Sequence, residues 1–257
     1  MSFTFGVLGI VLGIFVGMVA LMEVGRRMGR RRLQRDPEGA RAGVAAAEGA
    51  VFALLGLLIA FSFSGAAGRF HERRRLISEE CNAIGTAWLR LDLLPAEVQT
   101  PARESFRRYV DARLDVYRAI PDAATVREAV QLVSARQAEL WRAVLGAHGD
   151  AGREWELLLL PALNTMFDIG ATRTHAMSWH QPTIGLVLLC LLSLACALLA
   201  GFAMAAASHR PLVHILAFAA VVAVTVYVIL DLEYPRQGLL RIDESDQVLM
   251  EQRSGLR

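Results

Sequence analysis

Residues 181–208 read QPTIGLVLLCLLSLACALLAGFAMAAAS, and residues 211–230 read PLVHILAFAAVVAVTVYVIL. Neither run contains an Asp, Glu, Lys or Arg, and only two residues separate them. A helix needs roughly 20 apolar residues to cross the hydrocarbon core of a bilayer, and each run supplies enough of them. The two runs therefore predict two membrane-spanning helices joined as an antiparallel hairpin.

Two further charge-free runs, Met1–Met22 and Gly49–Gly68, lie in the first part of the chain. Only 20% of the 257 residues are charged, and the mean hydropathy is +0.40, whereas a soluble domain is nearer a quarter charged. These values exclude a single soluble globular enzyme. We expect an all-α fold, that of a polytopic membrane protein with four transmembrane helices, at residues 3–22, 47–68, 183–207 and 211–231.

The polar region between the second and third spans has 15 Arg and 15 acidic residues, and hence no net charge. Its apolar residues recur at helical spacing. One amphipathic stripe combines Phe106, Tyr109, Val110, Leu114 and Tyr117, and a second combines Val126, Val130, Val133, Leu140, Trp141 and Val144. The pattern predicts a helical extramembrane bundle.

Local signals place the ends of these helices. Thr100–Pro101 favours a helix start, because a capping hydroxyl precedes a proline at the first helical position. The second amphipathic helix is expected to follow Pro121–Asp122 and to end in the Gly149–Gly152 loop. A third, from Arg153 to about Ile169, is expected to be interrupted at Pro161. The predicted domains are residues 1–68, 69–181, 182–232 and a tail at 233–257.

The arginines leave the orientation in the membrane open. The loop between spans one and two has seven Arg and the hairpin has one, whereas the opposite side has seven near its span ends. The positive-inside rule compares these numbers, and they nearly balance. The density of the first loop favours a cytoplasmic location for that loop.

The end of the second span carries the first candidate site. Arg69, Glu72, Arg73, Arg74 and Arg75 follow the apolar run directly. Such a cluster is typical of an interfacial anchor whose side chains reach the headgroups. Repeated around the axis of a symmetric oligomer, it would instead form an electropositive pore mouth that concentrates anions.

The second candidate site is a stripe of the same span that contains Phe52, Gly56, Ile59 and Phe63. Packing or lipid contact is one interpretation of this stripe. In the other, Phe52, Ile59 and Phe63 line a pore and form a hydrophobic constriction that gates by dewetting. Small residues at Gly56, Ala60, Ser64 and Gly68 permit close approach of a neighbouring helix.

Other classes of function find no support in the sequence. The histidines and the three cysteines lack metal-ligand spacing, so no metal and no cofactor is expected. No nucleophile elbow, phosphate-binding loop or dinucleotide motif is present, and we expect no enzymatic activity. The net charge of +2 gives no indication of a nucleic-acid partner.

The segment Leu54–Ile77 resembles the end of the second span in bacterial bestrophins, through Leu55, Gly56, Phe61 and the pattern Arg69–Phe70–x–Glu72–x–Arg74–x–Leu76. It departs from them at Gly68, where an Asp is usual, and at His71, where a Trp is usual. Glu79–Gly85, Arg90–Pro95 and Asp231–Arg241 resemble the bacterial bestrophin-like domain family more closely, over nearly the whole chain.

This resemblance implies a homo-oligomer, pentameric in bestrophins, that lies in the bacterial inner membrane and conducts small inorganic ions, mainly anions such as chloride. It implies that span two lines the axis and that the region between spans two and three is cytoplasmic, which opposes the charge rule. The alternative is a non-conducting membrane scaffold or sensor whose helical domain binds a partner.

Overall fold

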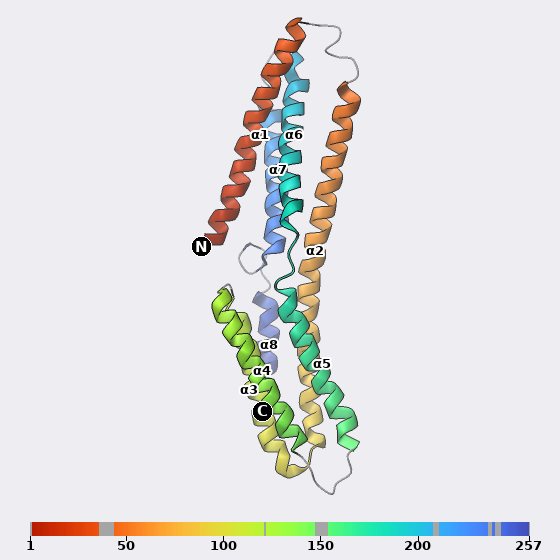
Figure 1. Ribbon diagram of the computed structural model, residues 1–257, viewed down its shortest axis with the longest axis vertical. Helices are drawn as coiled ribbons and strands as arrows, with labels where there is room; N and C mark the ends of the chain where they lie inside the picture. The colour runs from red at the N-terminus through yellow and green to blue at the C-terminus, as the bar shows by residue number, and fades with distance from the viewer. Residues whose placement is uncertain are drawn as a thin grey trace. The chain divides into compact units, whose positions relative to one another are not determined.

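A computed structural model describes residues 2–35, 44–120, 122–146, 154–207, 211–235, 238–239 and 243–256. All regular structure within these ranges is helical (Figure 1). The elements are α1 (Ser2–Arg35), α2 (Val44–Arg90), η2 (Leu91–Leu93), α3 (Ala96–Arg118), α4 (Ala123–Leu145), α5 (Glu154–Ala176), α6 (Thr183–Ala203), η3 (Met204–Ala206), α7 (Leu212–Glu233) and α8 (Asp243–Gly255).

Four helical segments are long and apolar enough to cross a membrane: Gly6–Arg35, Ala45–Leu93, Thr183–Ala206 and Leu212–Glu233. They overlap all four predicted spans, so within the described residues the all-α class and the four helices able to cross a membrane are confirmed. Two of them continue far beyond their apolar runs. The 47-residue helix α2 passes from the apolar run into the polar region without a break.

The chain divides into two units, of which the first comprises Met1–Phe70 and His180–Leu239. In this unit α1 packs along α6 and α7 (Figure 1). The core is built from fully buried side chains of these three helices, among them Met18, Met22, Leu189, Ala219 and Ile229. Helix α2 adds Leu55 and Ala66 to the same core.

Glycines allow the backbones of α1 and α6 to touch. A Cβ atom on Gly25 would overlap the carbonyl oxygen of Leu198, and one on Gly201 would overlap that of Met22. Gly29 lies one turn beyond Gly25, against Phe202 and Ala205. Small residues spaced by four therefore set the separation of these helices, as is common in membranes.

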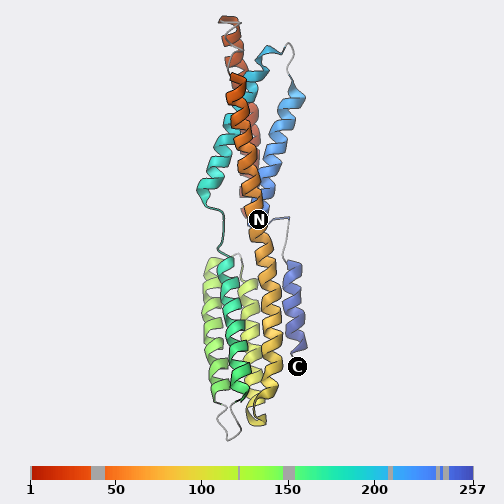
Figure 2. The same ribbon diagram turned by 90° about the vertical axis from the view of Figure 1, so that its right-hand side faces the viewer.

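The second unit comprises His71–Trp179 and Leu240–Arg257, with α3, α4 and α5 beside the latter part of α2 (Figure 2). The predicted stripe of α3 is buried throughout, which confirms its amphipathic character. Helix α4 begins as expected, since the Asp122 side chain accepts from the Ala124 amide at 3.1 Å. Its expected end in the Gly149–Gly152 loop falls outside the described residues.

The predicted start of α3 at Thr100–Pro101 is wrong. Helix α3 begins at Ala96, and Pro101 lies inside it. Pro95 is the extended N-cap residue, and its carbonyl accepts from the Val98 amide at 2.9 Å. The Gln99 side chain also donates to the Leu94 carbonyl at 2.8 Å, which ties the turn to the first helical residues.

The predicted interruption at Pro161 is also wrong, because α5 runs through this residue. A proline has no N–H for the carbonyl four residues before it, here that of Leu157. Arg90 of α2 donates to the neighbouring Leu158 carbonyl at 2.6 Å. A side chain of another helix thus binds the part of α5 that the proline weakens.

Candidate functional site

The predicted pore mouth begins at Arg69, which forms an ion pair with Glu233 at the end of α7. The Nε atom of Arg69 lies 2.9 Å from Oε1 of Glu233. The backbone amide of Gln181 donates to Oε2 of the same carboxylate at 3.3 Å. Glu233 is only 4% exposed. A buried carboxylate is strongly stabilised by a paired and hydrogen-bonded cation, so Arg69 fixes α2 to the end of α7.

A second buried carboxylate, Asp231, lies two residues before Glu233 on α7. It accepts from the Leu239 amide at 2.8 Å and from the Tyr227 hydroxyl at 3.3 Å. Gly238 passes so close that a Cβ atom there would overlap the Asp231 carboxylate. The acidic residues and the glycine of the tail motif therefore have direct structural roles.

The other arginines of the predicted mouth differ in their burial and in whether an acidic side chain compensates their charge. Arg73 is buried and donates to the carbonyls of Ala176, the last residue of α5, and of Trp179, three residues further on. Arg75 is exposed and pairs with Glu72 and, one turn further along the helix, with Glu79. Arg74 is exposed and makes no ion pair among the described residues. Arg74 therefore supplies the least compensated positive charge of this cluster.

The predicted pore-lining residues lie at the border of the packed face of α2. Phe52 and Ile59 are half-buried against the core of the first unit, and the Phe52 ring meets Phe218 edge-on at 6.0 Å. Phe63 is 45% exposed. The fully packed face of α2 carries Leu55, Ser62 and Ala66 instead.

The small residues of this span lie on its uncovered side. Gly56, Ala60, Ser64 and Gly68 are all exposed in the single chain. A Cβ atom added to Gly56 or Gly68 would meet nothing within 4 Å. The face that permits close helix approach therefore has no helix against it within the described chain.

A buried ionic network in the second unit was missed by the sequence analysis. The Glu80 carboxylate of α2 accepts from Arg113 Nε of α3 at 2.6 Å and from a terminal nitrogen of Arg173 of α5, also at 2.6 Å. All three residues are at most 4% exposed. Arg113 also donates to the Gly170 carbonyl at 2.8 Å, so the network connects three helices.

Tyr117 completes this network. Its hydroxyl donates to Glu80 at 2.9 Å, and the Arg173 guanidinium lies 3.5 Å from the centre of its ring. Burial raises the pKa of Tyr117 well above its ordinary value, and the Glu80 charge adds to this rise. One signal could have revealed the network: Arg113 lies four residues from both Tyr109 and Tyr117, within an otherwise apolar stripe.

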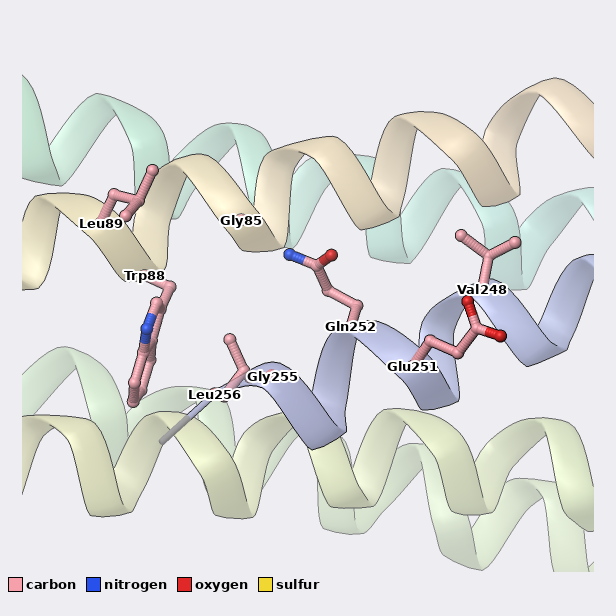
Figure 3. A pocket seen from close by; sticks show the side chains of 8 residues that line it. All are labelled: Gly85, Trp88, Leu89, Val248, Glu251, Gln252, Gly255 and Leu256. Carbon is pink, nitrogen blue, oxygen red and sulfur yellow. The ribbon is translucent and has the colours of Figure 1, made fainter.

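A groove of about 420 Å³ lies where α8 packs in the second unit. In Figure 3, Gln252 points toward Gly85 in the middle of the view, with Trp88 and Leu256 on one side and Val248 on the other. Arg253 of α8 binds Asp111 through two hydrogen bonds of 2.6 and 2.9 Å, and Arg107 donates to the Leu256 carbonyl at 2.9 Å. The groove is therefore the seam along which the last helix docks.

No group of three or more His, Cys, Asp or Glu side chains within the described residues could hold a metal ion. The His180 ring packs against the Tyr234 ring, with 4.8 Å between the ring centres. The three cysteines are free thiols. The polar side chains brought together at Glu233 and at Glu80 are arranged for ion pairing between helices.

Comparison with known proteins gives one family. A sequence model of the bestrophin-like domain matches residues 14–247, which include most of the first membrane-spanning helix, the other three in full and most of the second unit. No curated protein and no solved structure matches the chain. The match contains both motifs that the Arg69–Glu233 pair brings together. The chain belongs to the bestrophin-like domain family.

Proposed function

We propose that this protein is an oligomeric, anion-conducting channel of the bacterial inner membrane, with α2 lining the pore. The uncovered face of α2 is the observation that carries this proposal. Only 17% of the most apolar stretch of α2 is buried, against 22% for α1 and 33% for α6 and for α7. In an oligomer, neighbouring copies would cover the small-residue side of α2, and the bestrophin family suggests five copies.

The proposed mechanism combines a constriction with an electric field. Phe63 and the exposed sides of Phe52 and Ile59 would face the axis and narrow it with apolar atoms, so that the passage dewets when it closes. The Arg69–Arg75 segment would concentrate anions at one mouth. Arg74 would dominate this effect, because Arg69 is paired with Glu233 and Arg75 with Glu72 and Glu79.

The remaining parts of the proposal concern placement and partners. The second unit would lie outside the bilayer, on the cytoplasmic side together with both termini. Its partners would be the lipid bilayer, further copies of the chain and small inorganic ions. We propose no enzymatic activity, no cofactor and no nucleic-acid partner.

Ion flux in liposomes tests the constriction. We expect Ile59→Ala and Phe63→Ala to raise flux above that of the wild type, because a wider constriction stays hydrated. Phe61→Ala is the matched control, since Phe61 is 68% exposed and lies off the proposed pore stripe. The channel proposal is contradicted if the wild type and every variant give the flux of empty vesicles over a range of pH and calcium concentration.

The same assay tests the field of the mouth. We expect Arg74→Gln to lower the preference for anions, most strongly at low salt, because screening acts over about 8 Å at physiological ionic strength. Arg127→Gln, at an exposed position of α4, removes the same charge elsewhere. Arg69→Ala and Arg69→Gln test the field less directly, because either substitution also leaves the buried Glu233 without its partner and so changes the structure. Equal anion preference in Arg74→Gln and wild type would contradict the proposed role.

A non-conducting scaffold or sensor is the second candidate. Leu89 is 69% exposed, Leu157 is 78% and Leu158 is 50%, and Arg90 holds the two helices together at this end of the second unit. Exposed apolar patches can mark protein interaction sites. If no condition gives flux, loss of a co-purifying partner on Leu157→Ser would support the scaffold.

A further inference from the structure

Helix α1 continues for thirteen residues, 23–35, beyond its charge-free run. This extension holds six arginines and a single acidic residue, Glu23. Five of the arginines are exposed: Arg27, Arg30, Arg31, Arg32 and Arg35. The proposed channel does not use them, because they lie on another helix and at the opposite end of the apolar runs from Arg69.

The exposed face of the extension changes from apolar to cationic along the helix axis. Val24 is 43% exposed and Met28 is 52% exposed, and residues four apart share a helix face. Arg31 and Arg35 continue this face by one and two turns. Arg27 flanks it on one side and Arg32 on the other. The surface that leaves the apolar run thus leads directly into a row of guanidinium groups.

Little negative charge within the described residues compensates this row. Glu23 pairs with Arg26 at 3.3 Å and with Arg27 at 3.0 Å. Arg30 donates to the Ala207 carbonyl at 3.3 Å, and Arg32 lies 6.0 Å from the centre of the Phe202 ring. Arg31 and Arg35 have no acidic partner among the described residues.

We propose that the exposed arginines of the α1 extension bind the headgroup phosphates of anionic phospholipids. The apolar part of the face meets the acyl region, so the arginines that follow it stand at headgroup level. A guanidinium presents a planar fork that matches two phosphate oxygens. Arg31 and Arg35 lie one turn apart, a rise of about 6 Å, and bind the phosphates of one lipid or of two neighbours.

The choice of lipid follows from charge. Anionic headgroups carry a net negative charge, whereas the phosphate of phosphatidylcholine is neutralised by its own choline. Each arginine near an anionic surface strengthens binding about fivefold. We therefore expect phosphatidylglycerol to bind selectively and phosphatidylcholine to bind without dependence on these arginines. The proposal requires membrane insertion and does not depend on conduction.

Lipid retention by the purified full-length protein tests this proposal. Delipidated protein is titrated with phosphatidylglycerol or phosphatidylcholine, and bound lipid is measured by native mass spectrometry. We expect the triple variant Arg27→Gln, Arg31→Gln, Arg35→Gln to bind phosphatidylglycerol about 100-fold more weakly. The corresponding Lys variant should retain most of the binding, and phosphatidylcholine binding should not change. Arg31→Gln alone should weaken binding about fivefold, which keeps the test valid if the triple variant fails to fold.

A matched control removes three exposed arginines from the second unit, with Arg118→Gln, Arg127→Gln and Arg142→Gln. It should bind phosphatidylglycerol as the wild type does. Competition with millimolar inorganic phosphate separates a lipid site from a free-anion site, and we expect no displacement. The proposal is overturned if Arg31→Gln and the triple Gln variant bind like wild type, if the control loses as much binding, or if inorganic phosphate displaces the lipid.

Discussion

Glu80 is the centre of the buried ion network of the second unit. It brings one buried negative charge to two buried guanidinium groups, Arg113 and Arg173. An intact buried ion network adds little net stability, because desolvation offsets the attraction, but its disruption leaves charges without partners. The contribution of Glu80 to stability is therefore measured best by substituting it, which leaves the two guanidinium groups without their partner.

We predict that Glu80→Gln lowers the free energy of unfolding by about 3–5 kcal/mol, because two buried cations lose their common partner. The measurement is denaturant unfolding of the purified protein, followed by helical circular dichroism. Glu79→Gln is the control, since Glu79 is 38% exposed and pairs with an exposed arginine. Equal stability of the two variants would show that the network is not the main connection between these helices.

Alkaline pH should act on the same network. Burial raises the pKa of both Tyr109 and Tyr117 above the ordinary value near 10. The folded state therefore favours the protonated tyrosine. The resulting contribution to the free energy of unfolding is fully present below pH 10 and is lost as the pH rises toward the folded-state pKa. Each group lowers the free energy of unfolding by about 1.4 kcal/mol per pH unit in that window.

An alkaline titration that records phenolate absorbance together with helical circular dichroism checks this expectation. The two buried tyrosines should ionise only as helix is lost. A double variant, Tyr109→Phe with Tyr117→Phe, should lack this late absorbance change. Ionisation of both residues in a fully helical protein would contradict the expected order.

Among the elements, α1 and α6 make the closest helix contact of the first unit. Their separation is set by Gly25, Gly29 and Gly201, where no side chain stands between the backbones. Such contacts replace hydrophobic burial, which gives no driving force between helices in lipid.

We predict that Gly201→Val lowers stability by about 1–3 kcal/mol, a usual cost of overpacking, because the new side chain must separate the helices. Gly13→Ala should be neutral or slightly stabilising, since a Cβ atom there meets nothing within 4 Å. Thermal unfolding midpoints in one detergent compare the two variants. A Gly201→Val protein as stable as Gly13→Ala would show that α1 and α6 can separate at no cost.

The elements show how far the sequence can be used for prediction. Long apolar runs and amphipathic stripes predicted all four membrane-spanning helices and the buried face of α3, because burial dominates both patterns. Helix ends were predicted less well. Pro101 lies within α3, which begins at Ala96, and the Gln99 side chain binds the Leu94 carbonyl just before the helix. Pro161 lies within α5, where Arg90 of α2 binds the Leu158 carbonyl beside the weakened turn. The Arg90 bond is a tertiary contact, which a local signal does not contain.

The candidate site shows the same limit. Arg69 and the tail motif were both identified from the sequence, 164 residues apart, but their ion pair was not. The partners of Glu80 come from two other helices, and spacing along one helix cannot reveal them. Residues within one segment were therefore predicted well, and contacts between segments were not.

At the scale of the whole molecule, the side of the membrane on which each polar region lies follows from an even number of spans. We predict that residues 69–181 and both termini are cytoplasmic. Single cysteines at Glu38 and Asp150, both outside the described residues, are labelled from outside intact cells in a background without the native cysteines. Reaction at position 38 alone is expected. Reaction at position 150 alone would show that the arginines of the first loop set the orientation.

The last turn of α7 is where we expect local unfolding to begin. A helix carboxyl end has a partial negative charge, and here the last turn has no basic residue while Asp231 and Glu233 are buried in it. Arg69 supplies the main compensation for Glu233. This turn should therefore open before the rest of the helix, and its amide hydrogens should exchange with solvent earliest. In Arg69→Gln, exchange at residues 230–233 should accelerate while that at Val222 stays slow, so the first event in unfolding would begin at a contact between two distant sequence motifs.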